Sequence, residues 1–206
     1  MHALILVDIQ NDFLPTGALP VPNGDEVIAV ANRVQPLFPL IVATQDWHPA
    51  NHGSFAANNP GRKPGELADL GGFPQVMWPV HCVERTAGAA FAPGLDTTRV
   101  AQVFPKGTDP AIDSYSGFFD NGHRKATGLG DFLRARRVTD VFVLGLATDY
   151  CVKATALDAR QLGFHTHLIL DGCRGVELAP GDIDRAVAEM RAAGVRVVQS
   201  GDLIAD

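Results

Sequence analysis

Cysteine is scarce in this sequence, and the few residues present form no pairing pattern. The three cysteines, Cys82, Cys151 and Cys173, are too few and too widely spaced for a disulfide framework. There is no CxxC pair, which argues against a structural zinc knuckle. We therefore expect free thiols in a reducing compartment, and one of them is available for chemistry.

The chain also lacks an excess of positive charge. Its 17 lysines and arginines are outnumbered by 23 aspartates and glutamates, which gives a net charge of −6. Nucleic-acid binders usually carry a basic face, so we expect no nucleic-acid partner. A small neutral or cationic substrate fits this charge balance better, and the sequence is compatible with a homo-oligomer.

Long apolar runs are missing as well. No stretch approaches the about 18 apolar residues of a membrane span. The opening residues MHALILVD lack the basic start and the cleavage site of a signal peptide. We therefore expect a cytoplasmic protein with no membrane partner. With 206 residues, of which 46% are hydrophobic, the chain can bury one substantial core, so residues 1–206 are expected to form a single domain.

Short, nearly continuous apolar runs predict strands that are buried on both faces, as in a parallel sheet. They cover residues 2–7, 39–44, 100–104, 139–144, 164–170 and 195–198. Between them, apolar residues at helical spacing predict helices over about 25–38, 129–136, 151–162 and 183–193. Strands that alternate with helices indicate an α/β fold with right-handed crossovers. Residues 48 to about 93 are rich in Gly, Pro and Asn and predict a long loop, which in a compact domain is either functional or disordered.

Polar residues follow the predicted strands at the point where each strand ends. They are Asp8 after the first, Asp46 and His48 after the second, Lys106 after the third and Cys151 just past the fourth. Ligands of an open parallel sheet bind beyond the carboxyl ends of the strands, so these side chains should meet on one rim. Singly, Asp8 could cap a turn, Lys106 could be solvated and Cys151 could be a small buried hydrophobe. Together, a carboxylate, an ammonium and a thiol supply the base, the electrostatic activator and the nucleophile of covalent hydrolysis.

The position of Cys151 favours a nucleophile. A thiol at a helix N-terminus near a cation has its thiolate stabilised, which predicts a pKa below the free value of about 8.5. The turn GLATDYC also brings unpaired backbone N–H groups to the same place, where they can receive an oxyanion. Thr148 or Asp149 is the predicted helix cap.

A second cluster of polar residues lies in the stretch QDWHPANHGSF. Asp46 and His48 are two residues apart, so an extended backbone points them to the same side, where His81 could close around an ion. Mixed carboxylate and imidazole ligands suit one divalent transition metal, most simply zinc, with iron or manganese as alternatives. His52 and Ser54 are candidate further ligands, directly or through water. The alternative is that Asp46 caps the loop and the histidines are solvated.

Several longer motifs match a known family. They are LILVDIQNDF, TQDWHPANHGSF, WPVHC, FPKGTDPAIDSYSGFFDN and LGLATDYCVKATALDARQLGF followed by DGCRGV, and they span nearly the whole chain. Through them the chain resembles the nicotinamidases, also called pyrazinamidases, of the isochorismatase-like cysteine hydrolase superfamily. The resemblance implies a three-layer α/β/α fold with a mostly parallel six-stranded sheet, and it makes the loop at about residues 48–93 a metal-site insertion.

The resemblance also implies roles for the site residues. The catalytic triad is carried here by Asp8, Lys106 and Cys151, and the metal ligands are carried by Asp46, His48 and His81. Other amidases of the superfamily tend to lack this metal site, and ether-cleaving isochorismatases lack the cysteine. Both features together therefore indicate a nicotinamidase. The remaining metal ligand varies in the family, so His52 and Ser54 stay open.

The same resemblance describes the surroundings of the nucleophile. The peptide bond between Leu146 and Ala147 is expected to be cis, and the N–H groups of Ala147 and Cys151 are expected to form the oxyanion hole. Aromatic rings line the pocket in family members, and the matching residues are Phe13, Trp78 and Tyr115. Packing in the core is the alternative for these rings.

The activity that the resemblance implies is that of an amidohydrolase. Nicotinamide would be hydrolysed to nicotinate and ammonia through a cysteine thioester in NAD salvage, with pyrazinamide as a further substrate. One alternative is another amidase of the superfamily, acting on a carbamoyl or maleamate-type substrate. A second is a non-catalytic, metal-binding ligand sensor, against which the joint presence of Asp8, Lys106 and Cys151 weighs.

Overall fold

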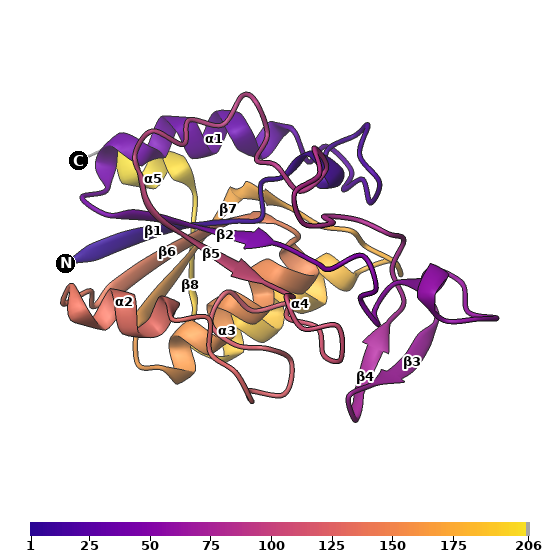
Figure 1. Cartoon of the computed structure of the whole chain (residues 1–206). Helices are drawn as coiled ribbons and strands as arrows, with labels where there is room; N and C mark the ends of the chain where they lie inside the picture. The colour runs from indigo at the N-terminus through magenta and orange to yellow at the C-terminus, as the bar shows by residue number, and fades with distance from the viewer. Residues whose placement is uncertain (205–206) are drawn as a thin grey trace.

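A six-stranded parallel sheet forms the centre of the computed structural model, which describes residues 1–204. The strand order is β5-β2-β1-β6-β7-β8, and every neighbouring pair runs parallel (Figure 1). The strands are β1 (His2–Val7), β2 (Ile41–Asp46), β5 (Val100–Lys106), β6 (Asp140–Leu146), β7 (His165–Arg174) and β8 (Arg196–Val198). The predicted α/β class is confirmed, and the six predicted strands are those of the sheet.

Helices cover both faces of the sheet and complete three layers. One face carries α1 (Glu26–Val34) and α5 (Ser200–Ile204), and the other carries α2 (Leu129–Ala135), α3 (Lys153–Gln161) and α4 (Asp182–Ala192) (Figure 1). The buried stripe of α1 consists of Val27, Val30, Ala31 and Val34, at the spacing of a helix that packs one face on a sheet. Helix α5 was not predicted, because five residues are too short to show a helical period.

Strand β1 pairs with β6 along the whole length of β1, from His2 opposite Asp140 to Val7 opposite Gly145. Gly145 has a φ of 129°. A Cβ atom at this position would lie 2.1 Å from the carbonyl oxygen of Val7, so only glycine allows the two backbones to approach this closely. The apolar run of β6 therefore reaches the rim beside the end of β1.

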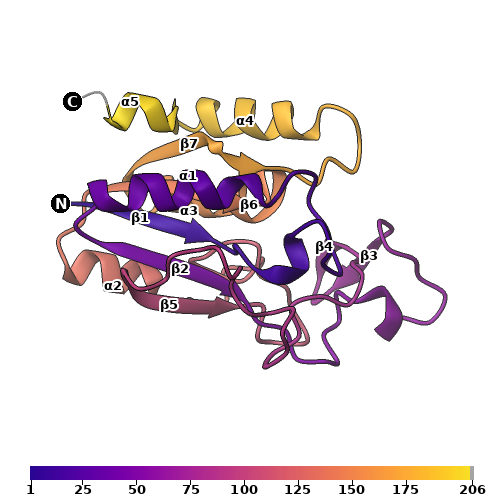
Figure 2. The same ribbon diagram turned by 90° about the horizontal axis from the view of Figure 1, so that it is seen from above.

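The segment of residues 48–93 does not form one irregular loop. It contains an antiparallel hairpin of β3 (Leu67–Leu70) and β4 (Phe73–Val76), which extends beyond the carboxyl ends of β2 and β5 (Figures 1 and 2). The hairpin was not predicted, because its two strands have only four residues each, too few to show a clear alternation of apolar and polar residues. Elsewhere in the segment, the side chain of Asn58 donates to the carbonyl oxygens of Ala50 and His52, which fixes the turn after β2.

Short 3₁₀ turns complete the described chain. They lie at Asn11–Phe13, Gln35–Leu37 and Ala56–Asn58, and one π-helical turn at Thr148–Val152 precedes α3. Over residues 1–204, none of the helices combines the length and the apolar composition needed to cross a membrane.

Candidate active site

Four strand ends bring the predicted polar residues to one rim of the sheet. Asp8 directly follows β1 and has a φ of 48°, a conformation that costs energy for a residue with a side chain. Asp46 and Lys106 are the last residues of β2 and β5 and lie opposite each other in the sheet register. Cys151 lies in the π-helical turn between β6 and α3. The structure thus places a carboxylate pair, an amine and a thiol side by side.

The ammonium group of Lys106 lies at the centre of this rim. Its Nζ atom is 2.9 Å from Asp8 Oδ2 and 2.8 Å from Asp46 Oδ1. It also donates to the carbonyl oxygen of Ser114 at 2.9 Å and lies 3.4 Å from Cys151 Sγ. One buried cation therefore contacts both carboxylates and the thiol.

Burial and charge give the two carboxylates opposite properties. Burial raises the pKa of Asp8, and the nearby Lys106 offsets this only in part. Burial would also raise the pKa of Asp46, but His48 and Lys106 outweigh it and hold that pKa well below its ordinary value. Burial opposes the charge on Lys106, yet the two carboxylates raise its pKa well above the usual value. Lys106 and Asp46 therefore stay ionised, while Asp8 is the carboxylate that can take up a proton.

The resting state of Cys151 differs from the prediction. Burial raises the pKa of its thiol well above the ordinary value, and the nearby Lys106 only partly compensates. The prediction of a stabilised thiolate was therefore wrong, because the sequence does not show that the thiol is buried and faces several carboxylates. The thiol is protonated at rest, so a base must remove its proton before it can act as a nucleophile.

The predicted helix cap was also wrong. The capping position is Ala147, and neither Thr148 nor Asp149 caps the turn. Asp149 is buried and instead accepts the backbone N–H groups of Val176 at 3.0 Å and Glu177 at 2.7 Å. Its carboxylate therefore fixes the loop after β7 to the turn that carries Cys151.

The peptide bond between Leu146 and Ala147 is cis, as the resemblance implies. In the part of the chain that the structure describes, the backbone N–H of Ala147 has no hydrogen-bond partner. Ala147 also lines the same pocket as Cys151. A free N–H group beside the thiol fits the expected oxyanion hole, whose second donor would be the N–H of Cys151.

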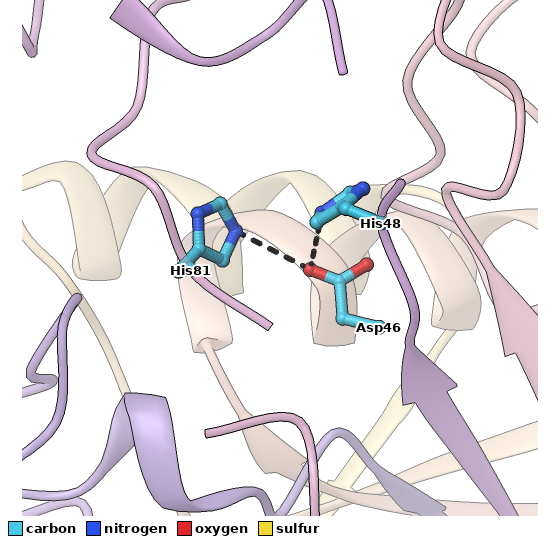
Figure 3. A group of neighbouring side chains, drawn as sticks. All are labelled: Asp46, His48 and His81. Atoms are coloured by element: carbon cyan, nitrogen blue, oxygen red, sulfur yellow. Dashed lines mark hydrogen bonds and ion pairs between the residues drawn. The ribbon is translucent and has the colours of Figure 1, made fainter. Parts of the chain in front are cut away.

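The predicted metal ligands form a second, adjoining cluster. Asp46, His48 and His81 are all buried, and one ligand atom of each lies within 4.8 Å of the other two. Figure 3 shows both rings directed at one carboxylate oxygen, with His48 Nε2 at 3.0 Å and His81 Nε2 at 3.4 Å from Asp46 Oδ2. Asp46 therefore belongs to both clusters, since its other oxygen contacts Lys106.

Hydrogen bonds on the far side of each ring determine which nitrogen faces Asp46 with a lone pair. His48 Nδ1 lies 2.9 Å from the carbonyl oxygen of Gly107, and His81 Nδ1 lies 2.8 Å from that of Pro79. A carbonyl oxygen only accepts, so each Nδ1 carries a proton and each Nε2 remains available for a metal. Two imidazole lone pairs and a carboxylate oxygen then converge on one point, a donor set that fits a divalent metal.

Without a metal, a proton can stabilise the same cluster. Burial lowers the pKa of His48, but the adjacent Asp46 outweighs it and raises the pKa to about 9. A metal ion would replace that proton, because only the neutral ring can donate its Nε2 lone pair.

The two further candidate ligands, His52 and Ser54, lie beside the metal cluster. His52 Nδ1 accepts the backbone N–H of Ser54 at 3.2 Å and lies 2.7 Å from Ser54 Oγ, so Nε2 carries the proton of the neutral ring. In the described part of the chain His52 Nε2 is buried without a hydrogen-bond partner. It belongs to a second possible ligand group with His48 and Asp113. His52 therefore lies beside the metal cluster without the free Nε2 lone pair that His48 and His81 offer, and Asp113 is a residue that the sequence analysis did not identify.

A small pocket opens onto both clusters. The residues that line it include Asp46, His81, Ala147 and Cys151 and the three predicted rings, Phe13, Trp78 and Tyr115. Trp78 Nε1 donates to the hydroxyl of Tyr115 at 3.1 Å, so these two rings form one fixed wall. The rings thus line the pocket as well as packing in the interior.

Four further lining residues were missed: Leu19, Asp113, Tyr150 and Val176. The ring of Tyr150 packs edge-on against Trp78, with centroids 4.9 Å apart, and extends the aromatic wall. Its place next to Cys151 in the sequence was an available signal. Leu19 and Val176 lie in irregular segments, where no periodic pattern predicts the direction of a side chain.

The fold and these clusters define a class of protein that the sequence comparisons identify. A sequence model of the isochorismatase domain matches residues 2–202, so the chain belongs to this family. The resemblance found in the motifs is confirmed.

Particular relatives are similar over the full length. An Escherichia coli protein named nicotinamidase is 50% identical over 205 residues, which cover 98% of this chain and 96% of that protein. A solved nicotinamidase/pyrazinamidase structure from Acinetobacter baumanii has a TM-score of 0.95 at 44% identity, covering 98% of this chain and 97% of that one. A pyrazinamidase of Pyrococcus horikoshii, solved in complex with zinc, has a TM-score of 0.78 at 40% identity and covers 96% of this chain and 98% of that one.

Proposed function

We propose that the protein is a nicotinamidase, which hydrolyses nicotinamide to nicotinate and ammonia through a thioester on Cys151. The observation that carries the proposal is the position of Lys106 Nζ, which contacts Asp8, Asp46 and Cys151. Asp46 and Cys151 in turn line the aromatic pocket. The full-length similarity to proteins named nicotinamidase supports the same reaction. The proposal treats the chain as one domain, because the site combines strand ends with residues of the segment 48–93.

Substrate binding follows from the walls of the pocket. Trp78, Tyr115 and Tyr150 offer flat apolar surfaces to an aromatic ring, while Cys151 lies where the carboxamide would be presented. Asp46, His48 and His81 would hold one divalent metal, with zinc supported by the zinc-bound relative. When bound, the metal supplies a Lewis acid that anchors a ring nitrogen of the substrate. Pyrazinamide has the same carboxamide and ring nitrogen, so it is a second expected substrate.

Asp8 is the proposed general base for the first step. It accepts the thiol proton of Cys151, while Lys106 stabilises the resulting negative charge. The sulfur then bonds to the carboxamide carbon, and the carbonyl oxygen becomes an oxyanion. The N–H groups of Ala147 and Cys151 receive this oxyanion, and a donor of this kind is worth about 3 kcal/mol in other enzymes.

Collapse of the intermediate completes acylation. Asp8 returns its proton to the leaving nitrogen, the C–N bond breaks and ammonia departs. Water then attacks the thioester as Asp8 takes up one of its protons. The C–S bond breaks, nicotinate is released and the proton returns to Cys151. Nicotinate from this reaction would enter NAD salvage.

Ammonia release from nicotinamide tests the proposal directly. Cys151→Ala should lower turnover by about 10⁴-fold or more while the zinc content stays at the wild-type level. The matched control is Cys173→Ala, since Cys173 is a buried thiol that donates to the carbonyl oxygen of Ile169 outside the pocket. Turnover by Cys151→Ala at the wild-type rate would exclude a thioester.

A comparison of substrates separates the proposal from its nearest rival. A nicotinamidase should prefer nicotinamide to an aliphatic carbamoyl or maleamate-type amide, and a chelator should abolish that preference. Efficient hydrolysis of the aliphatic amide, unchanged by chelator, would instead indicate another amidase of the superfamily. Binding of nicotinamide without any ammonia release would indicate a ligand sensor.

A further inference from the structure

Gln10 is a fully buried glutamine whose side-chain amide bonds to both the N–H and the carbonyl oxygen of Asp46, a proposed metal ligand. Its Nε2 donates to the carbonyl oxygen of Asp46 at 2.8 Å, and its Oε1 accepts the N–H of Asp46 at 2.8 Å. The second Nε2 proton goes to the carbonyl oxygen of Ala89, also at 2.8 Å. A buried amide with both protons and its oxygen engaged has one fixed orientation.

The need for these bonds follows from the end of the β1 and β2 pairing. Their register runs only to Leu6 opposite Ala43, three residues before Asp46. Beyond that point β1 turns away at Asp8, so it cannot supply backbone partners for Asp46. Lys106 pairs with Asp46 on the β5 side. The side chain of Gln10 thus replaces the missing strand on the other side.

The segment after β1 also holds the loop that carries His81. The carboxylate of Asp12 accepts the N–H of Cys82 at 2.7 Å, one residue from His81. The backbone of His48 in turn donates to the carbonyl oxygen of Cys82 at 3.0 Å. Hydrogen bonds from residues 10–12 therefore reach Asp46 directly, and they reach His48 and the neighbour of His81 through Cys82.

We propose that Gln10 is a positioning residue that sets the metal affinity of the site by fixing the backbone of Asp46. This inference rests on the proposed metal site of the nicotinamidase function. Asp46 has one oxygen between His48 and His81 and the other on Lys106, so a rotation of its backbone misdirects both oxygens. Loss of an outer partner of this kind weakens metal affinity by about 10–100-fold in other metalloproteins.

The test measures zinc affinity of the full chain, by competition with a chromogenic chelator and without any substrate. Gln10→Met removes all three hydrogen bonds, and Gln10→Glu keeps the shape but loses both donors. We expect zinc affinity to fall by about 10–100-fold in each. Gln35→Met is the matched control, because Gln35 is another buried glutamine that donates to a backbone carbonyl, that of Asp96 at 2.9 Å, outside the site.

A purely structural role would lower the melting temperature of the metal-free protein in all three variants and leave zinc affinity of the folded protein unchanged. Unchanged affinity in a folded Gln10 variant, or an equal loss in Gln35→Met, overturns the inference. A second measurement needs no variant: the side-chain amide NMR signal of Gln10 in the wild type should shift on addition of zinc, and that of Gln35 should not. Equal behaviour of the two signals would also overturn it. Failure of wild type to bind zinc at all would count instead against the proposed metal site.

Discussion

The strand ends and the long segment of residues 48–93 contribute to the same site by different means. Asp46 and Lys106 are held by the sheet register, which leaves their side chains little freedom. His81 belongs to an irregular loop and is held by single hydrogen bonds, such as that from its Nδ1 to the carbonyl oxygen of Pro79. The proposed reactive groups are thus positioned by the fold as a whole, and the proposed metal ligands are positioned partly by local contacts. Substitutions at the strand ends and substitutions in the segment 48–93 should therefore have different effects on stability, turnover and metal binding.

Substitution of Lys106 should affect both stability and turnover, because Lys106 contacts both carboxylates, and its effect should be the largest. Lys106→Met keeps the length of the side chain but leaves Asp8 and Asp46 buried without their shared cation. Removing one partner of a buried ion pair costs about 3–5 kcal/mol, so thermal unfolding should show a loss of this size together with loss of turnover. Lys153→Met is the control, because Lys153 forms a more exposed pair with Glu189 and should cost under about 1 kcal/mol. Equal losses in the two variants would contradict the shared-cation account.

His81→Ala should weaken metal binding and leave the contacts among the strand-end residues intact. Zinc affinity should fall by more than the about 10–100-fold expected for an outer partner, and KM for nicotinamide should rise. The thermal stability of the metal-free protein should change less than in Lys106→Met, because the strand ends remain paired. His165→Ala serves as control, since His165 is an exposed histidine paired with Asp140. Full zinc affinity in His81→Ala would remove His81 from the ligand set.

Metal removal should likewise affect substrate binding but not the reactivity of Cys151, and it requires no substitution. After treatment with a chelator, binding of nicotinamide should weaken to the level of benzamide, which has the carboxamide but no ring nitrogen. Alkylation of Cys151 by a small reagent should proceed at a similar rate before and after removal of the metal, because the thiol is positioned by the turn after β6 and by Lys106. Calorimetry for the two amides and mass spectrometry for the alkylated thiol would check this. A persistent preference for nicotinamide in the metal-free protein would argue against anchoring through the ring nitrogen.

The smallest effect is expected where the loop after β7 meets the turn that carries Cys151. Asp149→Asn keeps the shape but can accept only one of the N–H groups of Val176 and Glu177 well, at a cost of about 1–3 kcal/mol. Because Val176 lines the pocket, KM should rise several-fold and kcat should change less. The control is Asp182→Asn, whose carboxylate accepts the N–H of Ala179 at the far end of the same loop. A larger loss in kcat than in KM would indicate that Asp149 acts on the nucleophile instead.

The sequence predicts the regular strands and helices of the molecule and the polar residues that directly follow the strands. Continuous apolar runs predicted the six strands, and the polar residues after them marked the rim where Asp8, Lys106 and Cys151 meet. Hairpin β3–β4, the role of Asp149 and the lining residue Val176 were missed, because they depend on contacts between distant, irregular segments. The raised pKa of Cys151 was missed for a related reason: the extent of burial is a property of the folded chain.

Cys151 is only 7% exposed, and its thiol holds its proton at rest. Oxidants such as peroxide attack the thiolate, so a covered, neutral sulfur is a poor target for them. Nucleophilicity would then arise only during turnover, when Asp8 withdraws the proton in the presence of an amide. In this arrangement the sulfur is less readily oxidised than that of an exposed, ionised cysteine.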